Sequence, residues 1–290
     1  MTSTDRPVKI VTDSSAHLPH SERQKHDITV VPLNAIFGKT VYREELDLTN
    51  EQFYQMLPNA ESHPTTSQPS AGEFMEIYQP LLDAGREIVS MHLPSKLSGT
   101  YASACAAKTE LETQLKKALP LTIVDTPWLS MALGLLVIAA AQAAEAGQSR
   151  DQVLATINAL IPKLNLIFVL DTLEYLKRGG RIGGARAMLG TLLNVKPMLE
   201  VKHGLVEPLE QPRSRAKALK RLLEIVEERA GHNTPLHASV LHAVSPVDAA
   251  ALEKELRQRF DLKEFYLTEI GPAIGVHTGP NAVGLAFYVD

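Results

Sequence analysis

Short apolar runs alternate with helix-like segments along the first half of the chain. The runs Val8–Asp13, Glu87–Leu93 and Leu121–Thr126 predict strands, and each is followed by a polar loop and a segment of helical character. Strands that alternate with helices favour a parallel sheet covered by helices on both faces. In such a sheet the polar loops after the strands gather at one edge, where ligands bind.

Sequence signals for helix starts divide this half further. Ser or Thr followed three residues later by Glu or Gln, the pattern of a capping box, occurs at Thr49, Ser70 and Ser149, so we expect a helix after each. Before the first of them, Ile28–Gly38 and Lys39–Glu45 predict further strands. The first half is therefore expected to be a regular series of strands and helices.

The second half has a different pattern. A strand is predicted at Leu164–Thr172, then a hairpin that turns at His203-Gly204, and two amphipathic helices at Ser214–Ala230 and Pro246–Phe260. A chain of 290 residues suits two domains of ordinary size. We therefore predict two α/β domains, an N-terminal one over 1–163 with a largely parallel sheet covered by helices, and a C-terminal one over 164–290.

Composition narrows the functional classes. Lys plus Arg total 29 and Asp plus Glu total 33, so the formal charge is −4, which argues against a general nucleic-acid binder. Cys105 is the single cysteine, which excludes an internal disulfide and a cysteine metal cluster. The start, MTSTDRPVKI, lacks a signal pattern, and the apolar run Trp128–Ala144 predicts a buried helix rather than a transmembrane segment. We expect a cytoplasmic protein.

Two clusters of short polar side chains precede helices. Thr65 and Thr66 lie before the helix that Ser70 already caps, and Ser98, a well-placed N-cap, is followed by Gly99 and a helix of small residues. Free N–H groups and the positive end of the helix dipole attract negative charge at such positions. Together the two clusters predict an anion site, for a carboxylate or for a phosphate. Simple capping is the alternative.

A third candidate is the stretch Gly271–Gly284, GPAIGVHTGPNAVG. Its glycines and prolines predict a constrained loop that can turn N–H groups toward an anion. His277 in this loop can donate a hydrogen bond, and its charge would respond to a bound acid. A tight connection into the last strand is the equally simple alternative.

Positive charge gathers in the second half of the chain. The stretch Leu173–Leu199 contains Arg178 and several glycines, but neither G-x-G-x-x-G nor a phosphate-binding loop occurs in it. Its residues Ile182–Leu193 predict a helix with one apolar face. Pro212–Leu222 adds further basic residues, among them Arg213, and the two stretches together suggest a basic surface for an acidic partner. A solvated helix face is the alternative.

Signals for catalysis are weak. Asp13, Asp125 and Asp171 each follow a predicted strand, where carboxylates act as bases, bind metal or cap helices, and we favour the capping role. No G-x-S-x-G and no H-E-x-x-H motif is present. We therefore predict no catalytic residue, no metal site and no cofactor.

Six stretches in order along the chain resemble the DegV family of bacterial fatty-acid-binding proteins. The resemblance covers nearly the whole chain, and the long stretch from Leu173 to Leu199 together with T-S-Q-P-S is its most specific part. The stretches are VTDSS, TTSQPS, SKLSGTYASA, VDT with MALGLLV, LEYLKRGGRIGGARAMLGTLLNVKPML and HTGPNAVG.

The resemblance implies a lipid-binding protein that is not itself an enzyme. A long-chain fatty acid such as palmitate would lie in a tunnel between the two domains. Its carboxylate would be held by Thr66 and Ser98, next to Thr65 and Gly99, with His277 near the head group. The Ala-rich helix after Ser98 and the apolar face of 182–193 would line the tunnel.

The same resemblance implies a partner. Better-described members present their fatty acid to a separate ATP-dependent fatty acid kinase, and Arg178 and Arg213 would be the docking residues here. Two other hypotheses stay open. One is an enzyme or phosphocarrier for a small phosphorylated metabolite that uses Asp13, Asp125 and His277; the other is a regulatory protein that acts through protein contacts.

Overall fold

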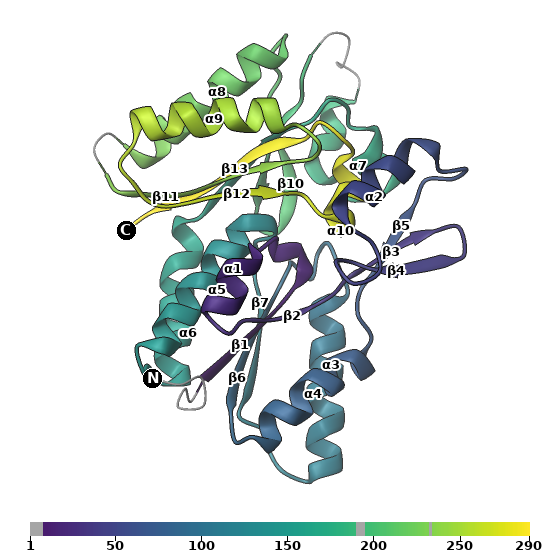
Figure 1. Cartoon of the computed structure of the whole chain (residues 1–290), viewed down its shortest axis with the longest axis vertical. Helices are drawn as coiled ribbons and strands as arrows, with labels where there is room; N and C mark the ends of the chain where they lie inside the picture. Colours follow the sequence, from purple (N-terminus) through teal and green to yellow (C-terminus); the bar gives the residue numbers. More distant parts are fainter. Residues whose placement is uncertain (1–7, 190–194, 232–233) are drawn as a thin grey trace.

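Two sheets, one above the other in Figure 1, form the frame of the molecule. The computed structural model describes residues 8–189, 195–231 and 234–290. The lower sheet has the order β2-β1-β6-β7, and all its strands are parallel, as the sequence predicts. These strands are β1 (Val8–Asp13), β2 (Thr29–Val31), β6 (Glu87–His92) and β7 (Leu121–Asp125).

Helices cover both faces of the lower sheet, which confirms the predicted arrangement. On one face Phe74 and Leu111, from α3 and α4, pack against Val11 and Ile88 of the strands. On the other face lie α5 and α6. The helices of this half are α1 (His20–Lys25), α2 (Asn50–Met56), α3 (Ala71–Asp83), α4 (Thr100–Leu115), α5 (Ser130–Glu145) and α6 (Arg150–Leu160). Capping boxes start α2, α3 and α6, as predicted.

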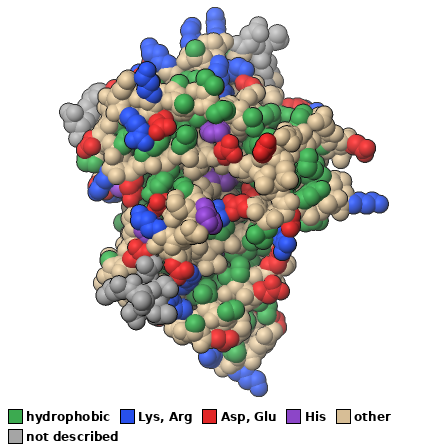
Figure 2. Space-filling model, viewed as in Figure 1, with side chains coloured by type: hydrophobic (Ala, Val, Ile, Leu, Met, Phe, Trp, Pro, Cys, Tyr) green, Lys and Arg blue, Asp and Glu red, His purple; other side chains and the backbone are tan. Residues whose placement is uncertain are grey.

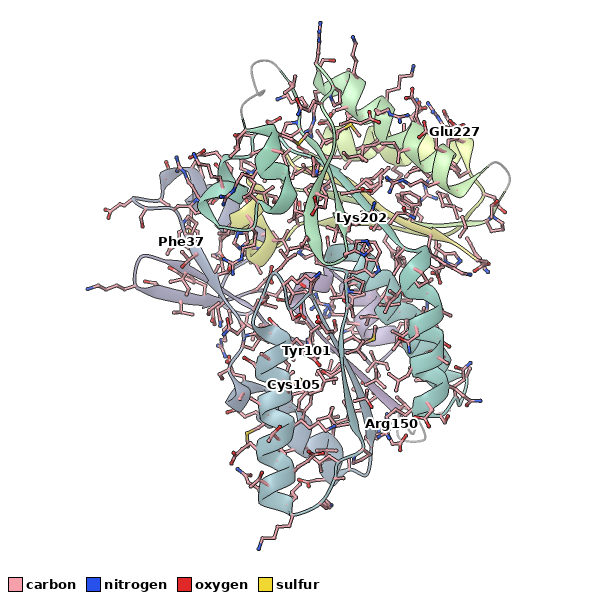
Figure 3. All side chains as sticks on the ribbon, turned by 180° about the vertical axis from the view of Figure 1, so that it is seen from behind. Phe37, Tyr101, Cys105, Arg150, Lys202 and Glu227 are labelled. Carbon is pink, nitrogen blue, oxygen red and sulfur yellow. The ribbon has the colours of Figure 1, made fainter. Side chains whose placement is uncertain are left out.

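A small antiparallel sheet of order β4-β3-β5 projects from the side of the molecule, where Figure 3 labels Phe37. The sequence predicts its first two strands but places them in the series of the main sheet. Pro32, which follows β2, lacks an N–H and cannot continue the ladder, so the chain leaves the main sheet there. The strands are β3 (Asn34–Phe37), β4 (Thr40–Arg43) and β5 (Thr65–Ser67).

The upper sheet is mixed and has the order β10-β9-β8-β13-β11-β12. β11 and β12 pair in parallel, whereas the other neighbours are antiparallel. The predicted hairpin turn is confirmed, since His203 and Gly204 both have positive φ, as a two-residue turn between β9 and β10 requires. The strands are β8 (Asn165–Val169), β9 (Met198–Lys202), β10 (Leu205–Glu210), β11 (Leu236–His242), β12 (Leu262–Glu269) and β13 (Val283–Val289).

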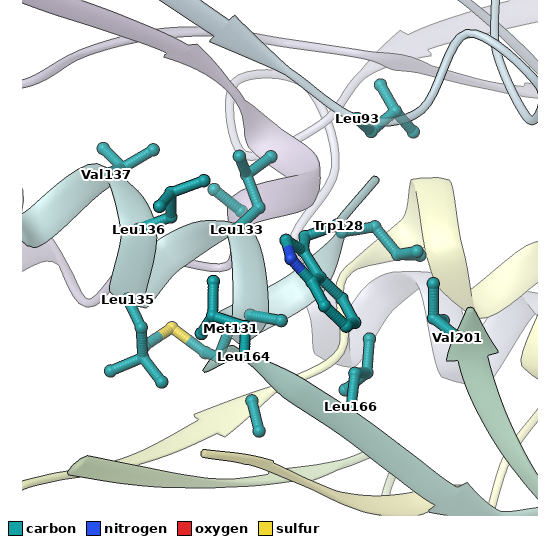
Figure 4. Packing of buried hydrophobic residues seen from close by; sticks show 14 of the residues in the cluster. Leu93, Trp128, Met131, Leu133, Leu135, Leu136, Val137, Leu164, Leu166 and Val201 are labelled. Atoms are coloured by element: carbon teal, nitrogen blue, oxygen red, sulfur yellow. The ribbon is translucent and has the colours of Figure 1, made fainter. Parts of the chain in front are cut away.

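The helix α5 lies between the two sheets and is buried along almost its whole length. Figure 4 shows Trp128, just before this helix, beside Leu166 of the upper sheet, and Met131 of the helix near Leu164. The outer face of the upper sheet is covered by α8 (Arg215–Ala230) and α9 (Pro246–Arg259). None of the helices in the described ranges is long and apolar enough to span a membrane.

Two short segments differ from the sequence prediction. Gly271–Gly284 is not a loop throughout, because it contains the helix α10 (Pro272–Thr278). The predicted apolar helix over 182–193 is instead a 3-10 helix, η5, and Leu192 and Leu193 lie outside the described residues. The remaining elements are α7 (Glu174–Arg178), η2 (Ser14–Ala16), η3 (Leu57–Asn59), η4 (Ile161–Lys163) and η5 (Gly183–Met188). The domain boundary at 163/164 stays a prediction.

Candidate functional site

A deep cavity lies between the lower and upper sheets, and we call it the interdomain cavity. The space between its atoms amounts to about 900 Å³, including the part that is open to solvent. Most of its wall is apolar, from both halves of the chain: Leu33, Leu93, Leu97, Leu129, Leu166, Phe168, Leu176, Val201, Val206, Leu241, Ile270, Ala273 and Ile274. Figure 4 shows Leu93 across from Leu166 and Val201 of the upper sheet. The apolar character of this wall suits a ligand that is largely hydrocarbon.

Three of the sequence-predicted polar residues line this same cavity, namely Thr66, Ser98 and His277. Thr66 Oγ1 and His277 Nε2 lie 3.0 Å apart and share a hydrogen bond. The Ser98 hydroxyl lies 2.9 Å from Thr100 Oγ1 and accepts a hydrogen bond of 3.3 Å from the Thr100 N–H. Residues far apart in the sequence, from β5, the loop before α4, and α10, are thereby brought to one site.

Thr65 and Gly99 are not among the described residues that line the cavity. Thr65 and Thr66 are consecutive in β5, so their side chains point to opposite faces, and that of Thr65 is exposed. Gly99, rather than Ser98, is the N-cap residue of α4. A Cβ atom at Gly99 would come within 2.9 Å of the Gln68 side chain, so the glycine allows Gln68 to approach the start of this helix.

The environment of His277 keeps its imidazole neutral. Burial, with the nearby charge of Arg181 as the second cause, lowers the pKa of His277 from 6.5 to about 4. Its Nδ1 is buried and has no hydrogen-bond partner among the described residues. A Cβ atom at Gly179 would lie 2.1 Å from this Nδ1, which explains physically why a glycine follows Arg178 at the end of α7.

Arg181 and Gln68 also line the cavity, and the sequence prediction did not include either of them. The Arg181 side chain is held by hydrogen bonds from its guanidinium to the carbonyls of Leu97 (3.1 Å) and Gly179 (2.8 Å). Both residues are exposed, so they mark the end of the cavity that opens to solvent. Nothing in the local sequence separates Arg181 from the other basic residues of Leu173–Leu199, whereas Gln68 lies within the quoted stretch TTSQPS.

The walls of the cavity differ from the predicted tunnel lining. The Ala-rich helix α4 directs Ala104 and Leu111 into the core beside the lower sheet. Neither α4 nor the apolar residues of η5 contribute to the described lining. The upper sheet supplies much of that surface instead, through side chains of β8, β9, β10 and β11.

The predicted docking residues are both at the surface. Arg178 forms an exposed ion pair of 2.8 Å with Glu174 one turn earlier in α7. Arg213 is exposed just before α8, and no ion pair of Arg213 occurs in the described part of the chain. Two basic side chains that follow Arg213 in the sequence form ion pairs with carboxylates, Arg215 with Asp248 and Arg221 with Glu210. Figure 2 shows blue side chains at the top of the molecule, over α8.

The three strand-end aspartates do not form one site. Asp13 accepts hydrogen bonds from the N–H groups of Ser15 and Leu93, both at 3.1 Å. Asp125 accepts one from the N–H of Ser95 at 2.8 Å. Asp171 lies in the C-terminal half of the chain and forms an ion pair with Lys196 of the same half. The first two tie loops to the sheet edge, as the favoured capping role requires. The described residues contain no cluster of three His, Cys, Asp or Glu side chains that fits a metal.

A buried His-Asp pair, His92 with Asp13, resembles a catalytic arrangement but is inaccessible. His92 lies 2.9 Å from Asp13 through Nδ1 and 2.8 Å from the Ser90 hydroxyl through Nε2. Ser90 in turn lies 2.7 Å from the Tyr78 hydroxyl. All four side chains are fully buried, so a substrate cannot reach the serine. The chain of hydrogen bonds serves the packing of the lower sheet against α3.

Comparisons with known proteins agree with this geometry. The family model described as "Uncharacterised protein, DegV family" matches residues 7–290. A DegV domain-containing protein of Streptomyces coelicolor is 39% identical over 282 residues, which cover 97% of this chain and 98% of that protein. Protein DegV of Bacillus subtilis is 33% identical over 281 residues, with 97% and 98% covered.

Solved structures give the same result. A fatty-acid-binding DegV family protein from Thermus thermophilus superposes with a TM-score of 0.91 at 36% identity, covering 98% of this chain and 100% of that one. A stearic-acid-binding protein from Eubacterium ventriosum gives 0.89 at 29% identity, with 97% and 98% covered. Because sequence and fold both match over nearly its whole length, this protein belongs to the DegV family.

Proposed function

We propose that the protein binds a long-chain fatty acid, such as palmitate or stearate, in the interdomain cavity. The carboxylate would lie against Thr66, Ser98 and His277, and the acyl chain would run along the apolar walls. The observation that carries the proposal is this pairing of a small polar cluster with a deep apolar cavity. The ligands of the similar DegV structures support it, since those proteins are described as fatty acid binding.

The polar cluster fits a carboxylate. A buried carboxylate needs hydrogen-bond donors or a counter-charge, because removing it from water is otherwise too costly. The hydroxyls of Thr66 and Ser98 can donate, and the neutral His277 can donate from Nε2 once its bond to Thr66 rearranges. Arg181 adds a positive charge at the open end.

The apolar walls would supply most of the affinity. Burying about 15 methylenes at ~0.8 kcal/mol each contributes roughly 12 kcal/mol. Loss of translational and rotational freedom costs about 4–15 kcal/mol, which offsets much of that gain. The head-group contacts then serve mainly to set the position of the chain in the cavity.

The alternative of a small phosphorylated metabolite is less well supported. Such a ligand would occupy the polar cluster and leave the leucine-rich walls in contact with water. Asp13 and Asp125, which this alternative needs as catalytic groups, already accept backbone hydrogen bonds at the sheet edge. The geometry therefore favours a carrier without turnover of its own.

We further propose that the protein presents its fatty acid to a separate ATP-dependent kinase in the cytoplasm. A carboxylate oxygen would attack the γ-phosphorus of ATP, so that an acyl phosphate forms and ADP leaves. Two observations support this step: the polar cluster lies near the open end of the cavity, and Arg178 and Arg213 are exposed on the second half. The two arginines would contact the kinase.

Identification of the extracted ligand tests the first step. Protein purified from bacterial cells should release a fatty acid that native mass spectrometry detects and chromatography identifies. Retention of a phosphorylated metabolite and no lipid would contradict the proposal. Arg213→Glu serves as a surface control, because it should leave the retained lipid unchanged.

A further inference from the structure

The helix α10 belongs to the second half of the chain but is packed on the first half. Four of its residues line the interdomain cavity, namely Ala273, Ile274, His277 and Thr278. Gly275, in the same helix, has no room for a side chain, because a Cβ atom there would come within 2.6 Å of the Phe53 ring in α2. Through this close contact the first half of the chain fixes the place of α10, and with it the place of His277.

Side chains from the first half also bind the backbone just before α10. The Tyr54 hydroxyl donates a hydrogen bond of 2.9 Å to the carbonyl of Ile270. His17 accepts one of 3.1 Å through Nε2 from the N–H of Gly271. The two bonds join residues that are 216 and 254 positions apart, and they fix the point at which the chain enters the helix.

Glu44 binds the helix itself. Its Oε1 accepts a hydrogen bond of 3.2 Å from the N–H of Ala273, the second residue of α10. The side chain is buried, and its Oε2 accepts a hydrogen bond from the Ser14 hydroxyl, which in turn accepts one of 2.9 Å from the N–H of Leu33. A Cβ atom at Gly271 would lie 2.1 Å from Oε1, so the carboxyl group fits closely against the start of the helix. Glu44 therefore caps α10 from a distant part of the chain.

We propose that Glu44 is a positioning residue for fatty-acid binding, because it holds α10 where His277 meets the carboxylate. The inference rests on the proposed fatty-acid binding. The seven residues of α10 make about two turns, so the helix moves as a unit and a shift at its start displaces His277. Hydrogen bonds weaken steeply when they are misaligned, whereas apolar contacts are not directional. The displacement should thus affect the head-group contact more than the contacts of the acyl chain.

A double-mutant cycle between Glu44 and His277 tests the proposal. Glu44→Ala removes the acceptor of the Ala273 N–H, and we expect palmitate to bind about tenfold more weakly, which is the equivalent of one hydrogen bond to a charged group. In the His277→Ala background, where Thr66 and Ser98 still bind the carboxylate, the same change should alter affinity by less than about twofold. Displacement of a fluorescent fatty acid measures all four proteins.

Unfolding by denaturant separates positioning from a general loss of structure. Glu44→Ala should lower the free energy of unfolding equally in both backgrounds, because the two side chains contact opposite ends of α10. Non-additive effects on binding together with additive effects on stability are therefore the expected result. An equal loss of affinity in both backgrounds would overturn the proposal, since Glu44 would then support the apolar wall or the fold and not the His277 contact.

Two further variants make the test specific. Burial raises the pKa of Glu44 to about 7, so a neutral amide is a close substitute at neutral pH, and Glu44→Gln should recover most of the affinity that Glu44→Ala loses. Glu45→Ala is the matched control, because this neighbouring carboxylate is exposed and pairs with Arg23 instead, and it should bind palmitate like wild type. Failure of the amide to recover affinity, or an equal loss in the control, would contradict the assigned role.

A milder variant keeps the test decisive if Glu44→Ala does not fold. Tyr54→Phe removes only the hydroxyl that binds Ile270, and it should weaken palmitate binding about threefold in the wild-type background and not in the His277→Ala background. An equal loss in both would again overturn the positioning of His277 while leaving fatty-acid binding intact. If wild type binds no fatty acid, both proposals fail.

Discussion

Two buried histidines, His277 and His17, each share a hydrogen bond with a hydroxyl of a residue that lines the interdomain cavity, yet they differ in what they leave unpaired. At the open end, His277 bonds Thr66 at 3.0 Å, and its other nitrogen has no partner among the described residues. His17, which is not itself part of the described lining, bonds the Ser130 hydroxyl at 2.8 Å and the Gly271 N–H at 3.1 Å. Both imidazoles are buried, and burial lowers the pKa of both.

The difference separates a candidate binding site from a contact that is complete within the protein. The open end adds the hydroxyl of Ser98 and the guanidinium of Arg181 to its histidine, so donors converge on space that a ligand can fill. His17 uses both ring nitrogens within the protein, so it has no donor to spare. Buried polar groups that are fully paired rigidify a structure, and those with spare capacity recognise ligands.

The largest effect on fatty-acid affinity should come from removing the two hydroxyls at the open end of the cavity. Thr66→Val together with Ser98→Ala leaves a buried carboxylate without two donors, which should weaken fatty-acid binding by about 2–4 kcal/mol, or roughly 30- to 1000-fold. Displacement of a fluorescent fatty acid measures the change. Thr65→Val is the matched control, because that side chain faces away from the cavity; an equal loss in the control would remove the assigned site.

Lowering the pH should reduce the free energy of unfolding through both histidines. Their folded-state pKa values, about 4 for His277 and about 3 for His17, lie below the unfolded value of 6.5, so the unfolded state binds more protons between these limits. Stability is therefore full above pH 6.5 and is lost as the pH falls toward 4, by up to about 3 kcal/mol per histidine.

Denaturant unfolding at a series of pH values checks this linkage. The variant His277→Gln should have a shallower pH dependence than wild type in this window, by up to about 1.4 kcal/mol per pH unit. The variant His17→Asn should show the same shallower pH dependence. Parallel curves for wild type and both variants would mean that the histidines are not held neutral by the fold.

A smaller effect is expected when the space for His277 is reduced. Gly179→Ala places a Cβ atom where it would meet His277 Nδ1, so the ring must shift, and we expect a loss of about 1–3 kcal/mol in unfolding free energy together with weaker binding. Gly72→Ala is the control, since its added Cβ would meet only Ser70 Oγ, at 3.8 Å. If both variants melt like wild type, the contact between Gly179 and His277 does not constrain the ring.

The smallest effect on binding should come from the surface. Arg213→Glu reverses an exposed charge that is not part of the cavity lining, so fatty-acid affinity should stay within about twofold of wild type. Kinase-coupled formation of acyl phosphate should fall, and the fall should diminish at high salt because the contact is electrostatic. Loss of binding as well would mean that Arg213 supports the pocket instead.

Local sequence signals predicted much of the fold. The capping boxes at Thr49, Ser70 and Ser149 each start a helix, because a cap depends on residues within one turn. In contrast, local signals did not predict the helix within the glycine- and proline-rich segment 271–284. Its helix α10 depends on distant residues: Glu44 accepts a hydrogen bond from the Ala273 N–H, and Phe53 packs so closely on Gly275 that a Cβ would come within 2.6 Å.

The site shows the same division. The sequence by itself determined which residues carry polar chemistry at the ends of strands and helices, so Thr66, Ser98 and His277 could be named in advance. Only the tertiary structure decided that Thr65 faces away, that Arg181 joins the open end, and that the upper sheet rather than the Ala-rich helix lines the cavity. Capping and strand periodicity act over a few residues, whereas a cavity wall is made where two sheets meet, and no short stretch of chain contains that information.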